Sequence, residues 1–455
     1  MAPAVPPHVR GLVAVCIMMW GVYCVYGMPG TLSKPLQAHL SLTDSQYTYF
    51  LSAMYTVFAA PNTVLPFFSG FMIQRYGEKR AMKVTVGCVA LGQLTFALGV
   101  ELRQIWIIML GRVVFGLGME VLGVLANIIA ARLFSDKKLT LALSLVLGVA
   151  RMGSVSNSIM TPLLVARNGV ASATWTMSLF AMSLTCLCSA YLLPGLPAPA
   201  NNASRSFDIA SIWRFSPVYW QLILICAVGY GGIGTFTNSA QRFLAARFFN
   251  NDQPAAGRAL SITYTLAAVL VPPFGIVLEM PWFRIPFALL ISNVLMTSAH
   301  LAFYIRSAGA ILPLAMLGTA YALYGTAFWA GLARSILDAG PSQPAQRSES
   351  RVGLLESQEH DILSNETLSE SHGSMLLDTS SDGQPDNLMA VGLGTATCFL
   401  NLSTALVPLL LAGVEQRFGY SGLEVVFITL AGCGCLASIK LAHMHRFAHT
   451  ETKRP

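Results

Sequence analysis

Apolar segments of about 20 residues recur along the whole chain, and they constrain its fold more than any other feature. A helix needs about 20 apolar residues to cross the hydrocarbon core of a bilayer, and only helices or closed barrels satisfy every backbone hydrogen bond there. The sequence therefore predicts an all-α membrane protein with twelve transmembrane helices. The twelve segments are residues 11–31, 46–73, 81–100, 104–133, 139–165, 171–193, 218–244, 258–279, 285–305, 311–336, 389–411 and 422–445.

Charge is scarce, and its distribution fits a membrane protein. Only 11% of the 455 residues are charged, which is too few for the surface of a soluble protein of this size. With the N-terminus placed in the cytosol, most of the 28 Lys and Arg residues fall in cytosolic segments. This positive-inside bias predicts that both ends are cytosolic, and it explains the net charge of +7 without nucleic-acid binding. The basic residues predicted on the opposite side are Lys34, Arg103, Arg167, Arg242, Arg247, Arg258, Arg306 and Arg417.

Motifs for catalysis or cofactor binding are absent from the sequence. All nine cysteines fall within predicted spans, and none is arranged as CxxC. Neither a phosphate-binding loop, nor a dinucleotide-binding fingerprint, nor a hydrolase triad is present. We therefore expect a protein that is not an enzyme and that needs no cofactor and no metal ion.

A segment rich in Pro, Ala and Asn divides the predicted helices into two groups of six. "MLG" occurs at 109–111 and again at 316–318, six spans later, and "TPLL" at 161–164 resembles "VPLL" at 407–410. Such an internal repeat is typical of a transporter built from two parallel halves. We predict an N-terminal six-helix bundle over 1–193, a cytosolic linker over 194–216, the first four helices of a C-terminal bundle over 217–337, and the last two helices with a cytosolic tail over 389–455.

Residues 338–388 have a different composition from the rest of the chain. Ser, Gln, Asp and Glu dominate, and acidic residues far outnumber basic ones. This composition predicts a disordered cytosolic loop. Two interpretations stay open, a tolerated insertion and a sorting or regulatory element.

Two opposite charges lie in the middle of adjacent predicted helices. Glu120 precedes Asp136 of the connecting turn by 16 residues, and Arg151 follows Asp136 by 15. Because antiparallel helices rise equally per residue, both side chains should reach about the same depth. Intramembrane charges usually face a water-filled pathway, so the pair predicts a site for a zwitterion, with Arg151 on a carboxylate and Glu120 on an ammonium group. The alternative is a buried ion pair that only locks the two helices.

Three further stretches are rich in Gly, Tyr and hydroxyl side chains, which is typical of helices that line a cavity. They are "WGVYCVYGMPG", "YGGIGTFTNS" and "YALYGTAFWAG". Trp329 lies 11 residues after the second "MLG" and Glu120 lies nine after the first, so Trp329 is expected either to wall the cavity or to pack. Arg112 is expected either to support the site or to extend toward the interface. Other candidates for substrate binding are Tyr26, Tyr55 and Asn401.

Residues 70–80, "GFMIQRYGEKR", resemble the loop signature of the major facilitator superfamily. "GRVVFGLG", at 111–118, is similar to the fourth-span signature of that superfamily. Gln74 stands where the signature has an acid, and Glu279 occupies the matching place in the second half. The resemblance implies two pseudo-symmetric bundles, and it implies gating roles for Gly70, Arg75, Arg80, Glu279 and Arg112.

Motifs in both halves also resemble the major facilitator superfamily domain-containing protein 1 family. They are "GRVVFGLGMEVL", "VARMGSVSNSIM", "AAPNTVLPFFSGF", "LGTAYALYGTAFW" and "FGYSGLEVVFITLAG". Members of that family are lysosomal membrane proteins that carry dipeptides by facilitated diffusion. The resemblance implies that Glu120 and Arg151 engage the amino and carboxyl ends of a dipeptide, and that Trp329 matches the Trp of the tenth span. It favours a lysosomal or endosomal membrane. The plasma membrane stays as the alternative, because the N-terminus lacks the acidic dileucine used for sorting in the family.

The leading interpretation is a uniporter for dipeptides or related zwitterions that acts as a monomer in the lipid bilayer. Span one carries no charge between Arg10 and Lys34, so we expect no obligatory proton cotransport. Two alternatives stay open: a carrier of single amino acids or organic anions, and a membrane scaffold or receptor that does not transport.

The predicted topology leaves no site for N-glycosylation. Asn202 and Asn365 lie in cytosolic segments, Asn401 lies inside a span, and the modification needs a lumenal loop. Members of the family that this chain resembles are protected by a glycosylated accessory protein with a single transmembrane span. We therefore expect an analogous accessory protein as a partner.

Overall fold

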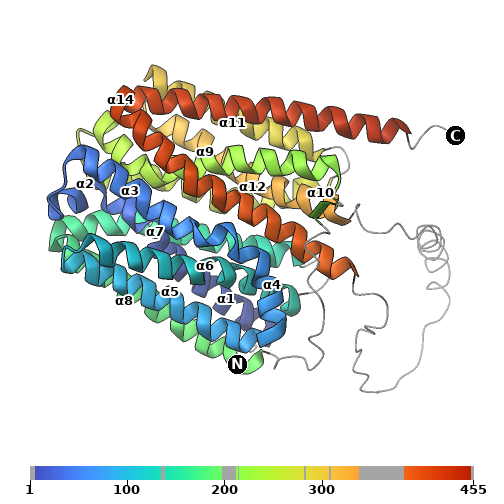
Figure 1. Cartoon of the computed structure of the whole chain (residues 1–455), viewed down its shortest axis with the longest axis horizontal. Coiled ribbons are helices and arrows are strands. Elements are labelled where there is room, and N and C mark those ends of the chain that lie inside the picture. The colour runs from blue at the N-terminus through green and yellow to red at the C-terminus, as the bar shows by residue number, and fades with distance from the viewer. Residues whose placement is uncertain are drawn as a thin grey trace, which may run out of the picture.

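The structure is a computed structural model, and it describes residues 6–134, 139–196, 212–213, 215–280, 283–306, 309–337 and 384–451. All regular elements within these ranges are helices, most of them long and lying side by side (Figure 1). The predicted all-α class is confirmed. The elements are α1 (Pro7–Tyr26), α2 (Met28–His39), α3 (Asp44–Ala59), the short 3₁₀ helix η1 (Pro61–Thr63), α4 (Leu65–Tyr76), α5 (Glu78–Glu101), α6 (Ile105–Leu133), α7 (Leu139–Asn168), α8 (Val170–Leu192), η3 (Leu193–Gly195), α9 (Pro217–Phe248), α10 (Gln253–Glu279), α11 (Ile285–Ile305), α12 (Ile311–Leu337) and α14 (Gln384–Glu451).

Ten of the described helical segments are long and apolar enough to cross a membrane. The last of them, Val391–Met444, has 54 residues and is too long for a single crossing. It bends back at Gly419, whose φ of 62° is favourable only for glycine (Figure 1). This one segment therefore contains both predicted spans 389–411 and 422–445.

The predicted span 46–73 is interrupted rather than continuous. Pro61 begins the 3₁₀ turn η1 between α3 and α4, because proline has no N–H to continue an α-helix. Span one is broken in a similar way at Gly27, between α1 and α2. With the interrupted span and the two limbs of α14, the part of the chain that the structure describes holds the twelve predicted crossings.

Glycines of the "GRVVFGLG" stretch bring neighbouring helices into close contact. A Cβ added to Gly111 would lie 2.5 Å from the backbone N of Phe96 in α5. A Cβ on Gly116 would lie 2.4 Å from the carbonyl oxygen of Phe58 in α3. Larger side chains would therefore push α6 away from both neighbours.

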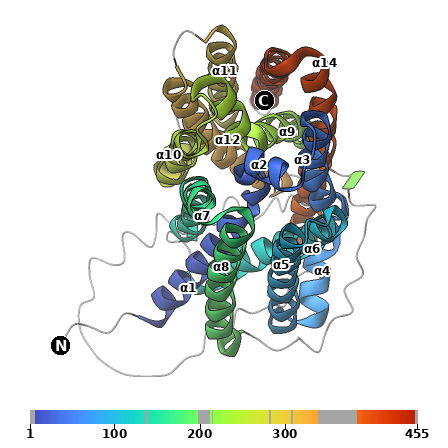
Figure 2. The ribbon, with the colours of Figure 1, turned by 90° about the vertical axis from the view of Figure 1, so that its left-hand side faces the viewer.

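The buried apolar side chains form two clusters, one for each half of the chain. The first joins residues 12–196 with Ala405, and the second joins residues 215–441. Figure 2 shows α5, α6 and α8 in one half and α10, α11 and α12 in the other. The halves meet where α7 packs on α10 and where α3 packs on α14.

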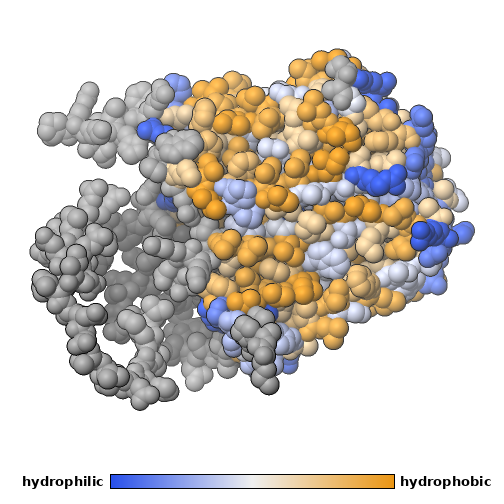
Figure 3. All heavy atoms as spheres, turned by 180° about the vertical axis from the view of Figure 1, so that it is seen from behind, coloured by the Kyte–Doolittle hydropathy of each residue, from blue (hydrophilic) through white to orange (hydrophobic). Residues whose placement is uncertain are grey.

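The outer surface is apolar over a wide band, with hydrophilic residues gathered at one end of the described surface (Figure 3). Leu187, Leu410 and Leu436 are each at least 66% exposed, although they lie within long helices. Soluble monomers do not expose contiguous apolar surface of this extent. The chain is therefore a multi-pass membrane protein, and this band faces lipid.

Candidate substrate site

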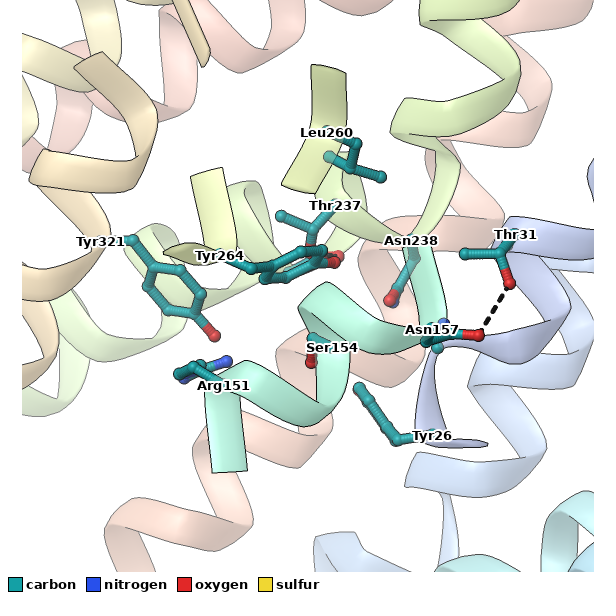
Figure 4. Close-up of a pocket in the computed structure, with 13 residues that line it drawn as sticks. Tyr26, Thr31, Arg151, Ser154, Asn157, Thr237, Asn238, Leu260, Tyr264 and Tyr321 are labelled. Carbon is teal, nitrogen blue, oxygen red and sulfur yellow. Dashed lines mark hydrogen bonds between the residues drawn. The ribbon is translucent and has the colours of Figure 1, made fainter. Parts of the chain in front are cut away.

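A cavity of about 50 Å³, lined by polar and aromatic side chains, lies between the two halves (Figure 4). One half contributes α1, α2 and α7, and the other contributes α9, α10 and α12. This volume accommodates a few water molecules, so the cavity is closed down in this conformation. Its lining consists of Tyr26, Gly27, Gly30, Thr31, Arg151, Ser154, Asn157, Gly234, Thr237, Asn238, Leu260, Tyr264 and Tyr321.

Arg151 is the only charged residue among the described residues of this lining. Its guanidinium carbon lies 4.1 Å from the centroid of the Tyr321 ring and 5.8 Å from that of Tyr23. In Figure 4 the Tyr321 hydroxyl points toward the guanidinium. The Arg151 side chain forms no hydrogen bond or ion pair with another described residue. The aromatic rings therefore hold the cation while its N–H donors remain available for a carboxylate.

Two amide side chains lie farther along the cavity. The Oδ1 atom of Asn157 accepts hydrogen bonds from Thr31 Oγ1 at 3.1 Å and from Thr161 Oγ1 at 2.8 Å. Its Nδ2 amide, like the whole amide of Asn238, forms no hydrogen bond with another described residue. Amides with free donors and acceptors suit a peptide group. Sequence reasoning missed Asn157, although Arg151, Ser154 and Asn157 follow one another every three residues on α7.

Glu120 does not pair with Arg151 in this structure. No carboxylate lies within 4.0 Å of Arg151 in the described residues, and Glu120 is not part of the cavity lining. Both Glu120 and Arg151 interact electrostatically with Tyr23 of α1, and Glu120 also interacts with Cys398 of the other half. The two charges therefore share an electrostatic neighbour, Tyr23, without contacting each other. The turn around Asp136, on which their predicted depth rested, lies outside the described residues.

The other predicted binding residues take different places. Tyr26 lines the cavity, and Tyr55 lies one layer behind it, where its hydroxyl accepts a hydrogen bond from the backbone N of Gly30 at 3.1 Å. Trp329 Nε1 donates to the Tyr230 hydroxyl at 3.1 Å, outside the lining.

Asn401 is buried in α14, outside the lining. Its Nδ2 atom donates to the carbonyl oxygen of Thr397 in its own helix at 3.0 Å. The structure therefore brings Tyr26 and Arg151 together in one cavity, whereas Tyr55, Trp329, Asn401 and Glu120 lie around it.

The sequence profile of the Major Facilitator Superfamily matches residues 15–350. This chain belongs to the Major Facilitator Superfamily. The predicted fold of two pseudo-symmetric six-helix bundles is confirmed, and the protein is a membrane transporter rather than an enzyme.

Two curated relatives carry the name lysosomal dipeptide transporter MFSD1. The bovine (Bos taurus) protein is 26% identical over 335 residues, which cover 70% of each chain. The human (Homo sapiens) protein is 26% identical over 336 residues, which cover 70% of this chain and 71% of the relative.

Among solved structures, a mutant of the nucleoside transporter NupG superposes with a TM-score of 0.59 at 12% identity, covering 95% of this chain and 99% of the other. A POT family transporter in complex with 5-aminolevulinic acid gives a TM-score of 0.62 at 10% identity, covering 95% of both chains. These two likenesses establish the fold alone.

Two of the five predicted gating residues, Arg75 and Arg80, lie at the corner between α4 and α5. Arg75 and Arg80 are exposed there, and the neighbouring ion pair joins Glu78 to Arg132 within the same half. Gly70 lies in α4, and Glu279 is the last residue of α10. None of the described ion pairs at this end connects the two halves.

Ion pairs between the halves occur instead at the far end, where α2 ends and α3 begins (left in Figure 1). Arg242 of α9 donates to Thr48 Oγ1 of α3 at 2.6 Å. It also lies 3.6 Å from Asp44 of α3 and 3.2 Å from Glu415 of α14. Lys34 Nζ adds a bond to Asn251 Oδ1 at 2.8 Å. The structure is therefore closed at this end.

A buried polar pair that the sequence reasoning missed lies inside the C-terminal half. His300 of α11 and Glu424 of α14 are buried, with 2.8 Å between Nδ1 and Oε2. The His300 ring stacks on Phe427, and their centroids are 4.8 Å apart. Neither residue of this pair lines the substrate cavity, and the pair links α11 to the second limb of α14.

Proposed function

We propose that this transporter carries dipeptides or related zwitterions as a uniporter that works by alternating access. The observation that carries the proposal is the cavity between the halves, where Arg151 is the one charged lining residue and has free donors. Arg151 would bind the substrate carboxylate through a two-point hydrogen bond. The free amides of Asn157 and Asn238 would bind the peptide group.

Glu120 would bind the substrate's amino group when the cavity widens. Both Glu120 and Arg151 interact electrostatically with Tyr23, so a dipeptide with its carboxylate on Arg151 would direct its ammonium toward the Glu120 carboxylate. The names of the relatives support the dipeptide and also support a lysosomal membrane.

Alternating access would use the far end as the lumenal gate. Opening that end would break the bonds of Arg242 to Thr48 and Asp44, and the bond of Lys34 to Asn251. Closing the cytosolic end would then require contacts other than those in this structure. A glycosylated accessory protein and a monomeric carrier complete the proposal.

Organic anions are a second candidate substrate. Among the lining residues there is a cation and no carboxylate, so the cavity as it stands favours an anionic group. A zwitterion needs Glu120 in addition, whereas a simple carboxylate does not.

Binding to purified protein distinguishes the two candidates. A panel of dipeptides, single amino acids and monocarboxylates is tested by thermal stabilisation. Arg151→Ala should abolish stabilisation by every ligand, whereas Glu120→Gln should abolish it only for ligands with an amino group. Arg167→Ala is the matched control, because Arg167 is exposed at the end of the same helix. Undiminished dipeptide binding by both variants would show that this site is wrong.

A further inference from the structure

Arg112 is a buried cation that has no polar partner among the described residues. Its side chain is 1% exposed, and Nε, Nη1 and Nη2 form no hydrogen bond with any described residue. No carboxylate of the described residues lies within 4.0 Å of it. Its guanidinium carbon is surrounded by four aromatic rings, with centroids at 5.1–5.9 Å. The rings belong to Tyr26, Tyr55, Phe58 and Phe115.

This environment stabilises the charge but leaves its donors unused. Ring faces attract a cation through their quadrupole, yet they offer no acceptor for the five N–H groups of a guanidinium. Arginine stays protonated in proteins. The group that best matches its planar fork is a carboxylate, which accepts two parallel hydrogen bonds.

The wall between Arg112 and the substrate cavity is one side chain thick. Tyr26 contacts the cavity, and its ring centroid lies 5.9 Å from the Arg112 guanidinium carbon. The hydroxyl of Tyr55 is bonded to Gly30, which also lines the cavity. The hydroxyl of Tyr26 forms no hydrogen bond with another described residue, so the side chain can turn without losing one.

The two arginines lie on either side of a tyrosine pair. Arg151 lies 5.8 Å from the Tyr23 ring, the Tyr23 and Tyr26 centroids are 5.9 Å apart, and Arg112 follows beyond Tyr26. A cavity of about 50 Å³ must widen before a dipeptide enters. Movement of Tyr26 during this widening would join the Arg112 compartment to the Arg151 compartment.

We propose that Arg112 is a second carboxylate-binding group of the substrate site, which binds the acidic side chain of a dipeptide once Tyr26 turns aside. This inference rests on the proposed dipeptide function. Arg151 takes the terminal carboxylate and Arg112 takes the side-chain carboxylate. A free dicarboxylate presents the same two groups, so the test includes one.

The test compares substrates that differ only in one charge. Alanyl-glutamate and alanyl-glutamine are titrated into the purified full-length chain, and binding is followed by thermal stabilisation. The parent should bind the acidic peptide at least tenfold more tightly. Arg112→Gln should reduce this ratio to about one without changing the affinity for alanyl-glutamine. Arg112→Lys keeps the charge but loses the planar fork, and should retain part of the preference. Arg103→Gln, at an exposed residue just before α6, should behave like the parent.

Several outcomes would overturn the inference. One is a parent that binds both peptides with about the same affinity, and another is a preference for the acidic peptide that persists in Arg112→Gln. A third is an equal loss of affinity for both peptides in Arg112→Gln, which would mean that Arg112 only supports the fold. If Arg112→Gln does not fold, the preference for the acidic peptide is measured in Arg112→Lys instead. A preference equal to that of the parent counts against the inference. Alanyl-glutamine that binds without any acidic preference refutes the role of Arg112 but leaves the dipeptide function standing. If glutarate binds through Arg112 while no dipeptide binds, the carboxylate-binding role of Arg112 is supported and the dipeptide function is refuted. Absence of binding by all these ligands refutes both.

Discussion

Replacing Gly257 by alanine should open the far end of the transporter. Gly257 of α10 faces α7 of the other half, and an added Cβ would lie 2.1 Å from the carbonyl oxygen of Ser158 and 3.1 Å from the Pro162 ring. Neither neighbour is a flexible side chain that can move away. To reach an ordinary contact of about 3.4 Å, the two helices must separate by about 1.3 Å.

The expected shift follows from the cost of that overlap. Inserting a methyl group into a well-packed contact costs about 1–3 kcal/mol, and the cost applies only while the far end is closed. A free-energy change of this size alters a two-state ratio by about 5- to 150-fold. A parent with about 1% of molecules open would therefore become roughly 5–60% open.

Distances between the unpaired electrons of two spin labels measure the fraction of molecules that are open at the far end. The labels are placed on Arg167→Cys and Asn250→Cys, at the far ends of α7 and α9, after exposed Cys186 and Cys433 are replaced by serine. Gly257→Ala should add a population at longer distance.

Gly123→Ala is the matched control, because an added Cβ there meets nothing within 4 Å. Equal distance distributions in the parent, the control and Gly257→Ala would refute the reasoning, provided that all three remain folded.

Three other predictions concern the charged groups and the coupling. Arg242→Met should also increase the open population at the far end, but by only a few fold, since Asp44 is largely exposed and its pairing is screened. The same spin labels measure this population, and an unchanged distance distribution would show that Arg242 is not part of a gate. His300→Ala leaves Glu424 buried without its partner and should lower the free energy of unfolding by about 3–5 kcal/mol, whereas a wild-type melting temperature would show that the pair contributes little. Dipeptide should not accumulate against its gradient in vesicles driven only by a pH gradient, because span one has no charge between Arg10 and Lys34; accumulation would contradict the uniporter.

By itself, the sequence determined the membrane class and the number of crossings. A run of about 20 apolar residues has few alternatives to a transmembrane helix, so span positions follow from local composition. The same local reasoning identified Arg151 and the Gly- and Tyr-rich stretches, because a charge or a loosened helix inside an apolar run is conspicuous. Residues of all three stretches, including Tyr26, Asn238 and Tyr321, do line the cavity.

Which charges meet was decided only by the tertiary structure. Equal depth predicted that Glu120 and Arg151 could pair, but depth does not fix the direction in which a side chain leaves its helix, and Arg151 packs on Tyr321 instead. The bond from Arg242 to Thr48 joins residues 194 positions apart, which no local pattern reveals. The isolation of Arg112 among four rings likewise requires three helices to converge, and it becomes visible only after α1, α3 and α6 have packed.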